Sequence, residues 1–222
     1  MRGVAGDRFT GGVRIEQVAE GTHVLVGDAV NWAVLVEGDA VTLVDAGYPR
    51  DAEAVVASLA ALGHRPEDVV AVLVTHAHVD HVGGLPPLVD RVGMPVLSGY
   101  GELAHLHGAV REQATPARVA SRAWRPRVAR WAAHAARLGA TTHVTVPSAL
   151  GVPDGVALDL PGHPVPLTVP GHTSGHTAWH LPSVDTLFVQ RKISGTALLA
   201  ARLKARVDVR AMVAARVAGT GD

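Results

Sequence analysis

Four side chains that can bind a metal fall within one short stretch of the chain. They are His76, His78, Asp80 and His81. Three histidines this close together would crowd positive charge at low pH unless a ligand binds there. Imidazole nitrogens combined with a carboxylate suit Zn²⁺, and Fe or Mn less selectively. The spacing therefore predicts a metal site rather than a packing cluster.

A second histidine pair, His172 and His176, lies about a hundred residues further along the chain. A catalytic zinc usually keeps three protein ligands and leaves one position for water. His76 and His78 can supply two of them. His172 is the first choice for the third, because Gly171 lets the backbone turn sharply beside it. We expect His176 to orient a ligand or a loop by a hydrogen bond instead.

Both groups of histidines follow apolar segments that are typical of strands. Val69–Thr75 is almost wholly apolar without alternation, which suits a strand buried on both faces. The end of such a strand is where an α/β protein usually places its chemistry. Val165–Val169 precedes His172 in the same way. Each histidine group is therefore expected at a strand end.

The rest of the chain divides into β-rich and α-rich segments. Short β-branched runs predict further strands at His23–Gly27, Trp32–Glu37, Val41–Asp45, Pro95–Ser98, Val156–Leu160, Ala178–Leu181 and Thr186–Val189. Helices are expected over Asp51–Leu62 and from Gly84 or Leu85 to just before Gly93. This order fits an α/β fold in which two sheets pack together with helices outside.

Residues 101–142 differ in composition and predict a helical insertion between sheet elements. Three- and four-residue steps separate Trp124, Val128, Trp131, Ala135 and Leu138, and a proline at position 126 suits a first helical turn. We expect a packing stripe on a covering helix, with a substrate lid as the alternative. The solvated face is expected to hold Arg122, Arg125, Arg127, Arg130 and Arg137.

The composition is that of a globular chain without cysteine chemistry. Its 222 residues suit one medium domain, expected to span residues 1–222. With 0 cysteines, disulfides, thiolate zinc sites and cysteine nucleophiles are excluded. The net charge of +0 argues against nucleic acid as a partner, and no apolar stretch is long enough to span a membrane. Because Met1–Val18 also lacks the apolar core of a signal peptide, we expect a cytoplasmic protein.

The motif His-x-His-x-Asp-His, followed by the histidine loop at His172, resembles the metallo-β-lactamase superfamily, which includes glyoxalase II-like and lactonase-like hydrolases. The segment Val41–Gly47 is similar to that family's strand ending in Asp-x-Gly, here with Asp45. Leu62-Gly63-His64 with Pro66 resembles its link into the motif strand. The resemblance covers residues 13–189, interrupted by the helical insertion.

The resemblance implies an αββα sandwich with metals at one edge. In that family the positions matching His76, His78 and His172 bind the first metal, and those matching Asp80 and His81 help to bind a second. Metal-activated water then attacks a carbonyl or phosphoryl centre. The resemblance further implies that Asp80 orients or deprotonates this water. It also implies that Asp45 holds the motif loop by hydrogen bonds.

Two features of that family are missing from the C-terminal part. The metal-bridging aspartate follows the strand that matches Thr186–Val189, where this chain has Gln190 and Arg191. A cation at the bridging position would repel the metals. The terminal histidine is also absent, because all 13 histidines occur at or before His180. We therefore expect one Zn²⁺, with a second metal weakly bound or absent.

Residues 190–222 form an atypical tail without proline, histidine or aromatic residues. Two explanations compete: a divergent helix or the product of a frameshift. The helix would place one stripe on Leu199, Leu203, Val207, Val213 and Val217. The frameshift is favoured, because the loss of the motif and the change of composition coincide. An intact reading frame across Val189 would contradict it.

The expected function is that of a metal-dependent hydrolase acting on a small-molecule ester, lactone or thioester. The alternative is a catalytically impaired metal-binding domain that lacks the bridging aspartate and the terminal histidine. An oxygenase or oxidoreductase ranks lower, since Arg191 replaces a carboxylate that several such relatives need. A nuclease also ranks lower, because the balanced charge offers no phosphate track. The patterns do not determine the substrate's identity or the oligomeric state.

Overall fold

The computed structural model describes residues 8–10 and 13–184 of the chain. The chain divides into two units, Met1–Ser183 and Val184–Asp222. The expectation of a single domain over residues 1–222 stays a prediction. The strand expected at Thr186–Val189 and the tail 190–222 lie outside the described residues. Within the described part, no helix has both the length and the apolar character needed to cross a bilayer.

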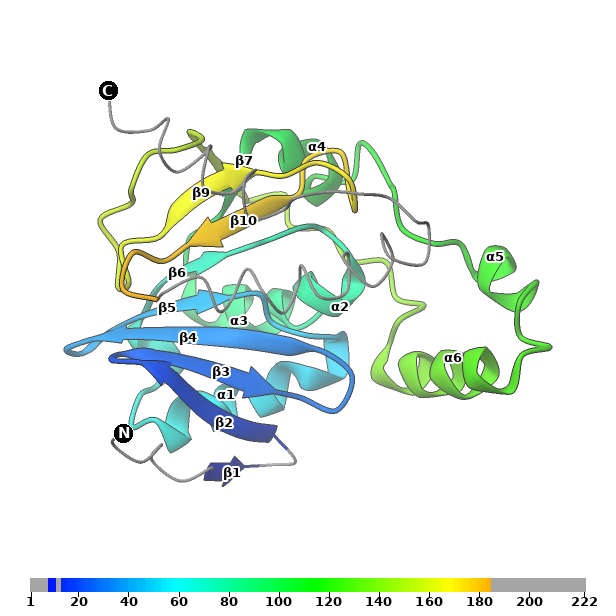
Figure 1. Cartoon of the computed structure of the whole chain (residues 1–222), viewed down its shortest axis with the longest axis horizontal. Coiled ribbons are helices and arrows are strands. Elements are labelled where there is room, and N and C mark those ends of the chain that lie inside the picture. Colours follow the sequence, from blue (N-terminus) through cyan, green and yellow to red (C-terminus); the bar gives the residue numbers. More distant parts are fainter. Residues whose placement is uncertain (1–7, 11–12, 185–222) are drawn as a thin grey trace. The chain divides into compact units, whose positions relative to one another are not determined.

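The fold is built around an eight-stranded mixed sheet (Figure 1). Its strands lie in chain order: β1 Arg8–Thr10, β2 Val13–Ala19, β3 Thr22–Val26, β4 Asn31–Glu37, β5 Ala40–Val44, β6 Val69–Leu73, β7 Val96–Gly99 and β8 Leu150–Val152. The strands β1 to β5 pair antiparallel, whereas β5 to β8 pair parallel. Parallel neighbours need crossover connections, which here include helices and the insertion.

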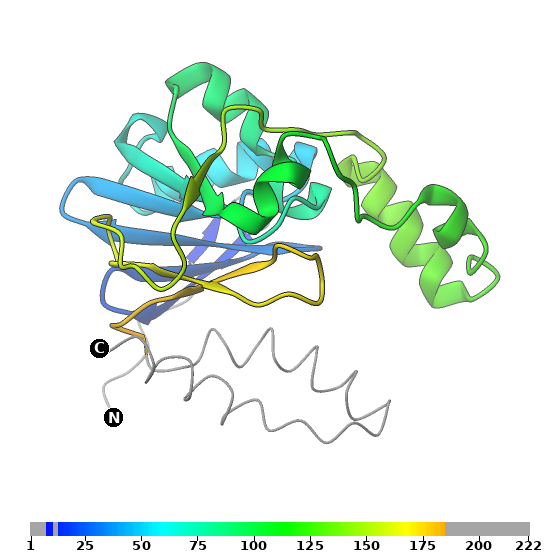
Figure 2. The ribbon, with the colours of Figure 1, turned by 90° about the horizontal axis from the view of Figure 1, so that it is seen from above.

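Helices α1 (Ala52–Ala61) and α3 (Leu85–Val92) lie in two of these crossovers and cover one face of the sheet (Figure 2). Short helical turns η1 (Pro49–Asp51), η2 (Pro66–Asp68) and α2 (Val79–Val82) complete the connections. The main core lies between helices and sheet, and includes the fully buried Leu43, Val55, Leu59, Val72 and Leu85. Gly93 ends α3 with a φ of 71°, a conformation that favours glycine.

A two-stranded antiparallel sheet, β9 (Val165–Thr168) with β10 (Thr177–His180), lies on the other face (Figure 2). Leu73, Val152 and Trp179 form an apolar cluster between the two sheets. The Trp179 indole also donates to the Val74 carbonyl at 3.3 Å. This succession of helices, sheet and second sheet confirms the predicted α/β fold with stacked sheets.

The insertion consists of η3 (Tyr100–Glu102), α4 (Leu103–Leu106), α5 (Pro116–Ala120) and α6 (Pro126–Leu138). The predicted packing stripe is wrong for both of its tryptophans, because Trp124 is 75% and Trp131 54% exposed. Packing involves the C-terminal end of α6, where Ala135 contacts the cluster of Tyr48 and Val79. The five arginines expected on the solvated face are all exposed.

Most predicted strands and both early helices are confirmed to within a few residues. The strand predicted at Val156–Leu160 is wrong. This segment is irregular, with a bend at its end, and makes isolated backbone contacts, such as the Leu158 N–H donating to the Pro164 carbonyl at 3.0 Å. The strands β1, β2 and β8 were not predicted. In β2 the alternation was visible, since Val13 and Ile15 are buried and their neighbours are not.

Candidate metal centre

The motif loop begins at the C-terminal end of β6. His76 and His78 lie in this loop, and the short helix α2 that follows carries Asp80 and His81. Gly83 lets the end of α2 lie against η1, because a Cβ there would lie 2.4 Å from the backbone nitrogen of Pro49. The sequence therefore brings all four motif side chains to the end of one buried strand.

The structure brings His76, His78 and His172 together. One candidate ligand nitrogen from each side chain lies within 4.8 Å of those of the other two. The three rings are also evenly spaced, with 4.6 Å between the centroids of each pair. His172 reaches this position from the loop between β9 and β10. The predicted grouping of these three histidines is thus seen in the geometry, while their role as ligands stays a prediction.

The chemistry of the three-histidine group fits a divalent metal. The Nε2 atom of His78 is buried and has no hydrogen-bond partner among the described residues. Burial, followed by the charge of the nearby His172, lowers the pKa of His78 to about 4. The His78 ring is therefore neutral at pH 7, which is the form that binds a metal. A buried nitrogen that is neutral and unpaired is well suited to a metal such as zinc.

Asp80 and His81 lie next to this group but are not part of it. His81 is 8% exposed, and its ring centroid is 4.1 Å from that of His76. Its Nδ1 atom lies 2.7 Å from Asp45 Oδ2, and its Nε2 atom lies 3.5 Å from Asp80 Oδ2. Burial acts to raise the pKa of Asp80, but the hydrogen bond and charge of His81 outweigh it and hold that pKa below its ordinary value. Asp80 is therefore ionised at neutral pH.

Asp45 holds the motif loop by hydrogen bonds, as the family resemblance implied. Asp45 Oδ1 accepts from the Thr75 N–H at 2.8 Å, and Oδ2 accepts from the Thr75 hydroxyl at 2.8 Å. Together with the 2.7 Å contact to His81, these bonds tie the end of β5 to both ends of the motif. Asp45 has a φ of 58°, a left-handed conformation that aspartate tolerates better than most residues.

His176 lies beside the group, with its ring centroid 5.0 Å from that of His76 and 6.0 Å from that of His172. It is not among the three histidines that could share one metal ion within the described part of the chain. The expectation that its side chain orients a ligand or a loop stays a prediction.

Glu102, a carboxylate with no exposed surface, was not among the predicted site residues. Glu102 ends η3 directly after β7, and it accepts hydrogen bonds from the Ala77 N–H at 2.8 Å and the Thr173 hydroxyl at 2.8 Å. A polar residue at a third strand end, β7, was the signal that could have revealed it.

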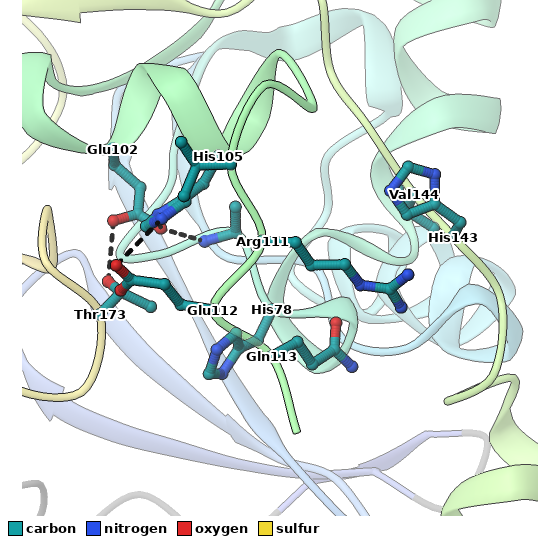
Figure 3. A pocket seen from close by; sticks show the side chains of 11 residues that line it. His78, Glu102, His105, Arg111, Glu112, Gln113, His143, Val144 and Thr173 are labelled. Atoms are coloured by element: carbon teal, nitrogen blue, oxygen red, sulfur yellow. Dashed lines mark hydrogen bonds and ion pairs between the residues drawn. The ribbon is translucent and has the colours of Figure 1, made fainter. Parts of the chain in front are cut away.

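A pocket opens beside His78 and is lined partly by the insertion (Figure 3). Its walls include His105, Val110, Arg111, Glu112, Gln113, His143 and Val144. The pocket thus combines a candidate ligand, His78, with polar and apolar groups that could contact a small substrate.

The chain belongs to the metallo-β-lactamase superfamily, whose sequence profile matches residues 25–189. The predicted family and fold are therefore confirmed. The Rm3 metallo-beta-lactamase has a similar structure, with a TM-score of 0.58 and 24% sequence identity over 77% of this chain and 57% of that chain. At this identity the likeness supports the fold alone.

Two curated relatives match parts of the chain. The probable metallo-hydrolase YybB of Bacillus subtilis (strain 168) is 36% identical over 72 residues, which are 32% of this chain and 31% of the relative. The hydroxyacylglutathione hydrolase of Rhizobium meliloti (strain 1021) is 30% identical over 149 residues, which are 63% of this chain and 43% of the relative. The matches thus span less than half the length of each of these two relatives.

Proposed function

We propose that the protein is a metal-dependent hydrolase that uses metal-activated water on a small ester, lactone or thioester. The grouping of His76, His78 and His172 carries this proposal, because three imidazoles leave a fourth zinc position open. Zn²⁺ is the proposed metal, with Fe or Mn as alternatives that the same ligands accept less selectively. A small-molecule substrate, rather than nucleic acid or a membrane, is part of the same proposal.

The chain's own residues divide the work between binding, orientation and proton transfer. His76, His78 and His172 would hold the metal, which supplies Lewis acidity and an activated water when bound. Asp80 is ionised at neutral pH and can accept a proton from that water or orient it. The ring of His81 contacts two carboxylates. Its Nε2 atom contacts Asp80 and its Nδ1 atom contacts Asp45, so His81 holds the Asp80 carboxylate in place. A second metal at Asp80 and His81 would be weakly held.

Among the three proposed substrate classes, the relatives favour a thioester. The Rhizobium relative is named as a hydrolase of hydroxyacylglutathione, and its match covers 63% of this chain. The Bacillus relative is named only as a probable metallo-hydrolase. The thioester form of the proposal therefore has more support from the comparisons than the lactone form.

The test is hydrolysis of a p-nitrophenyl ester, a γ-lactone and an S-acyl glutathione, with added Zn²⁺, Mn²⁺ or Fe²⁺. We expect metal-dependent turnover that falls about 100-fold or more in Asp80→Asn, which removes the proton acceptor. Asp90→Asn makes the same change at an exposed position of α3 and should keep wild-type turnover. Absence of turnover on all three substrates with every metal would contradict the proposal.

A second candidate is a metal-binding domain with impaired catalysis. It is favoured by Gln190 and Arg191, which occupy the positions where the family's glycine and metal-bridging aspartate are expected. The double variant Gln190→Gly with Arg191→Asp separates the two candidates. If the wild-type chain binds one zinc without turnover and the double variant gains a second zinc and turnover, the impaired domain is the better description.

A further inference from the structure

Glu102 is a buried carboxylate that the predicted metal site does not use as a ligand. Its side chain has no exposed surface, and a buried carboxylate is costly unless donors surround it. The hydrogen-bond donors around Glu102 therefore indicate its structural role. Two of them belong to the two loops that carry the candidate metal ligands.

One oxygen of Glu102 contacts the motif loop, and the other contacts the His172 loop. Oε1 accepts from the Ala77 N–H at 2.8 Å, and Ala77 lies between His76 and His78. Oε2 accepts from the hydroxyl of Thr173, the residue after His172, at 2.8 Å. Figure 3 shows the Glu102 carboxylate bonded to both loops. A single side chain thus joins the segments that must approach each other to share one metal.

Glu102 also contacts a second side chain of the insertion, His105. His105 Nδ1 lies 2.9 Å from Glu102 Oε1, and His105 Nε2 lies 3.6 Å from Glu112 Oε1. Glu112 Oε2 in turn accepts from the backbone N–H of Ser174 at 2.6 Å. A chain of two carboxylates and one histidine therefore contacts the His172 loop at two successive residues.

The backbone of the insertion also contacts the backbone of the His172 loop. A Cβ added to Gly175 would lie 2.1 Å from the carbonyl carbon of Gly101, so no larger side chain fits between them. On the His76 side, the loops are joined by the Thr177 N–H donating to the Thr75 carbonyl at 2.8 Å. Glu102 supplies the corresponding connection on the His78 side, because its bond goes to the residue directly before His78.

We propose that Glu102 is a positioning residue of the metal centre. It fixes the separation between the motif loop and the His172 loop, so that His78 and His172 present their nitrogens to one metal ion. Because the side chain is not among the three candidate metal ligands and both of its oxygens accept hydrogen bonds from the loops, its effect appears in metal affinity and ligand geometry. The inference rests on the proposed function only in requiring that the three histidines bind a metal.

The test compares two substitutions of Glu102 with different hydrogen-bonding capacity. Glu102→Gln keeps an oxygen for the Ala77 N–H and gains an amide that can donate to the Thr173 hydroxyl. Glu102→Met keeps the volume and loses both acceptors. Zinc affinity is measured by competition with a chromogenic chelator, and ligand geometry by the visible spectrum of bound Co²⁺. We expect the dissociation constant for zinc to rise about 10- to 100-fold in Glu102→Met, with an altered Co²⁺ spectrum. Glu102→Gln should restore most of the affinity.

Thr173→Val tests the same connection without disturbing the buried carboxylate's other contacts. Loss of one hydrogen bond should weaken zinc binding about 5-fold. Its matched control is Thr42→Val, since Thr42 is also fully buried and its hydroxyl has no partner among the described residues. Thr42→Val should leave zinc affinity unchanged.

The outcomes separate this inference from the proposed function. A wild-type chain that is folded but binds neither zinc, iron nor manganese would overturn the proposed function. Wild-type affinity and Co²⁺ spectrum in a folded Glu102→Met protein would overturn the positioning role alone. If Glu102→Met does not fold, Thr173→Val decides: zinc affinity equal to that of Thr42→Val would overturn the role, and weaker affinity would support it. Hydrogen exchange of the Ala77 amide, faster in Glu102→Met than in wild type, is the accompanying metal-free readout.

Discussion

Replacing Asp45 should destabilise the metal-free protein more than most single substitutions do. Asp45 is 4% exposed and accepts from the Thr75 N–H, the Thr75 hydroxyl and the His81 ring. In Asp45→Ala the buried Thr75 N–H loses its acceptor, at a cost of about 1–3 kcal/mol. Loss of the carboxylate's contact with His81 adds about 1.5–3 kcal/mol. Alanine in the left-handed conformation, φ 58°, adds about 1–2 kcal/mol.

These contributions predict that Asp45→Ala lowers the free energy of unfolding by about 4 kcal/mol or more, a large part of the 5–15 kcal/mol typical of a domain. Two matched variants separate the causes. Asp45→Gly loses the same hydrogen bonds without the left-handed strain, so it should be about 1 kcal/mol more stable than Asp45→Ala. Asp45→Asn tolerates the same backbone and keeps one oxygen acceptor, so its loss should be about 1–2 kcal/mol.

Urea unfolding of metal-free protein at pH 7 measures these differences without the contribution of a bound metal. The expected order of stability is wild type, Asp45→Asn, Asp45→Gly and Asp45→Ala. A loss below about 1 kcal/mol in Asp45→Ala would refute the view that Asp45 holds the motif loop. Equal losses in Asp45→Asn and Asp45→Ala would refute the role assigned to the hydrogen bonds.

Burial and backbone geometry predict three further outcomes. Burial raises the pKa of Tyr48 from 10.0 to about 12. The folded state then keeps a proton that the unfolded chain releases, so stability is full below pH 10 and falls as the pH rises toward 12. Tyr48→Phe should remove this loss together with the late step in phenolate absorbance. Trp131→Ala should change the free energy of unfolding by less than about 1 kcal/mol, against about 3–5 kcal/mol for the buried Trp32→Ala; equal losses in urea unfolding would contradict the structure of the insertion. Gly83→Ala should cost about 2 kcal/mol or more, because its Cβ would lie 2.4 Å from neighbouring backbone, whereas Gly93→Ala has open space and should cost only about 1–2 kcal/mol of left-handed strain; thermal unfolding of the two variants checks the order.

The sequence predicts the three-histidine group because its signals are local. His76 and His78 directly follow a buried apolar strand, and His172 lies shortly after β9. Strand ends of a sandwich fold gather at one edge. The proximity of the two loops can therefore be predicted without knowing any side-chain contact. The hydrogen bonds of Asp45 to the motif loop were also implied by the family resemblance, whereas its left-handed conformation was not predicted.

Other features depend on long-range contacts that no local pattern contains. Glu102 becomes a buried link only because Ala77 and Thr173, 25 and 71 residues away in sequence, supply its donors. The helical period of the insertion predicts one apolar stripe, but it does not show whether a surface covers that stripe. Trp124 and Trp131 therefore look like core residues in the sequence and are exposed in the structure.

The most direct test is the zinc content of the purified chain, measured by elemental analysis for the wild type, His172→Ala and His134→Ala. His134 lies on α6 and pairs with the exposed Asp28, so its replacement controls for the loss of one histidine. The prediction is about one zinc per wild-type and His134→Ala chain, with a sharp fall in His172→Ala. A folded wild-type chain without zinc, iron or manganese, or equal metal content in all three proteins, would contradict the three-histidine metal centre.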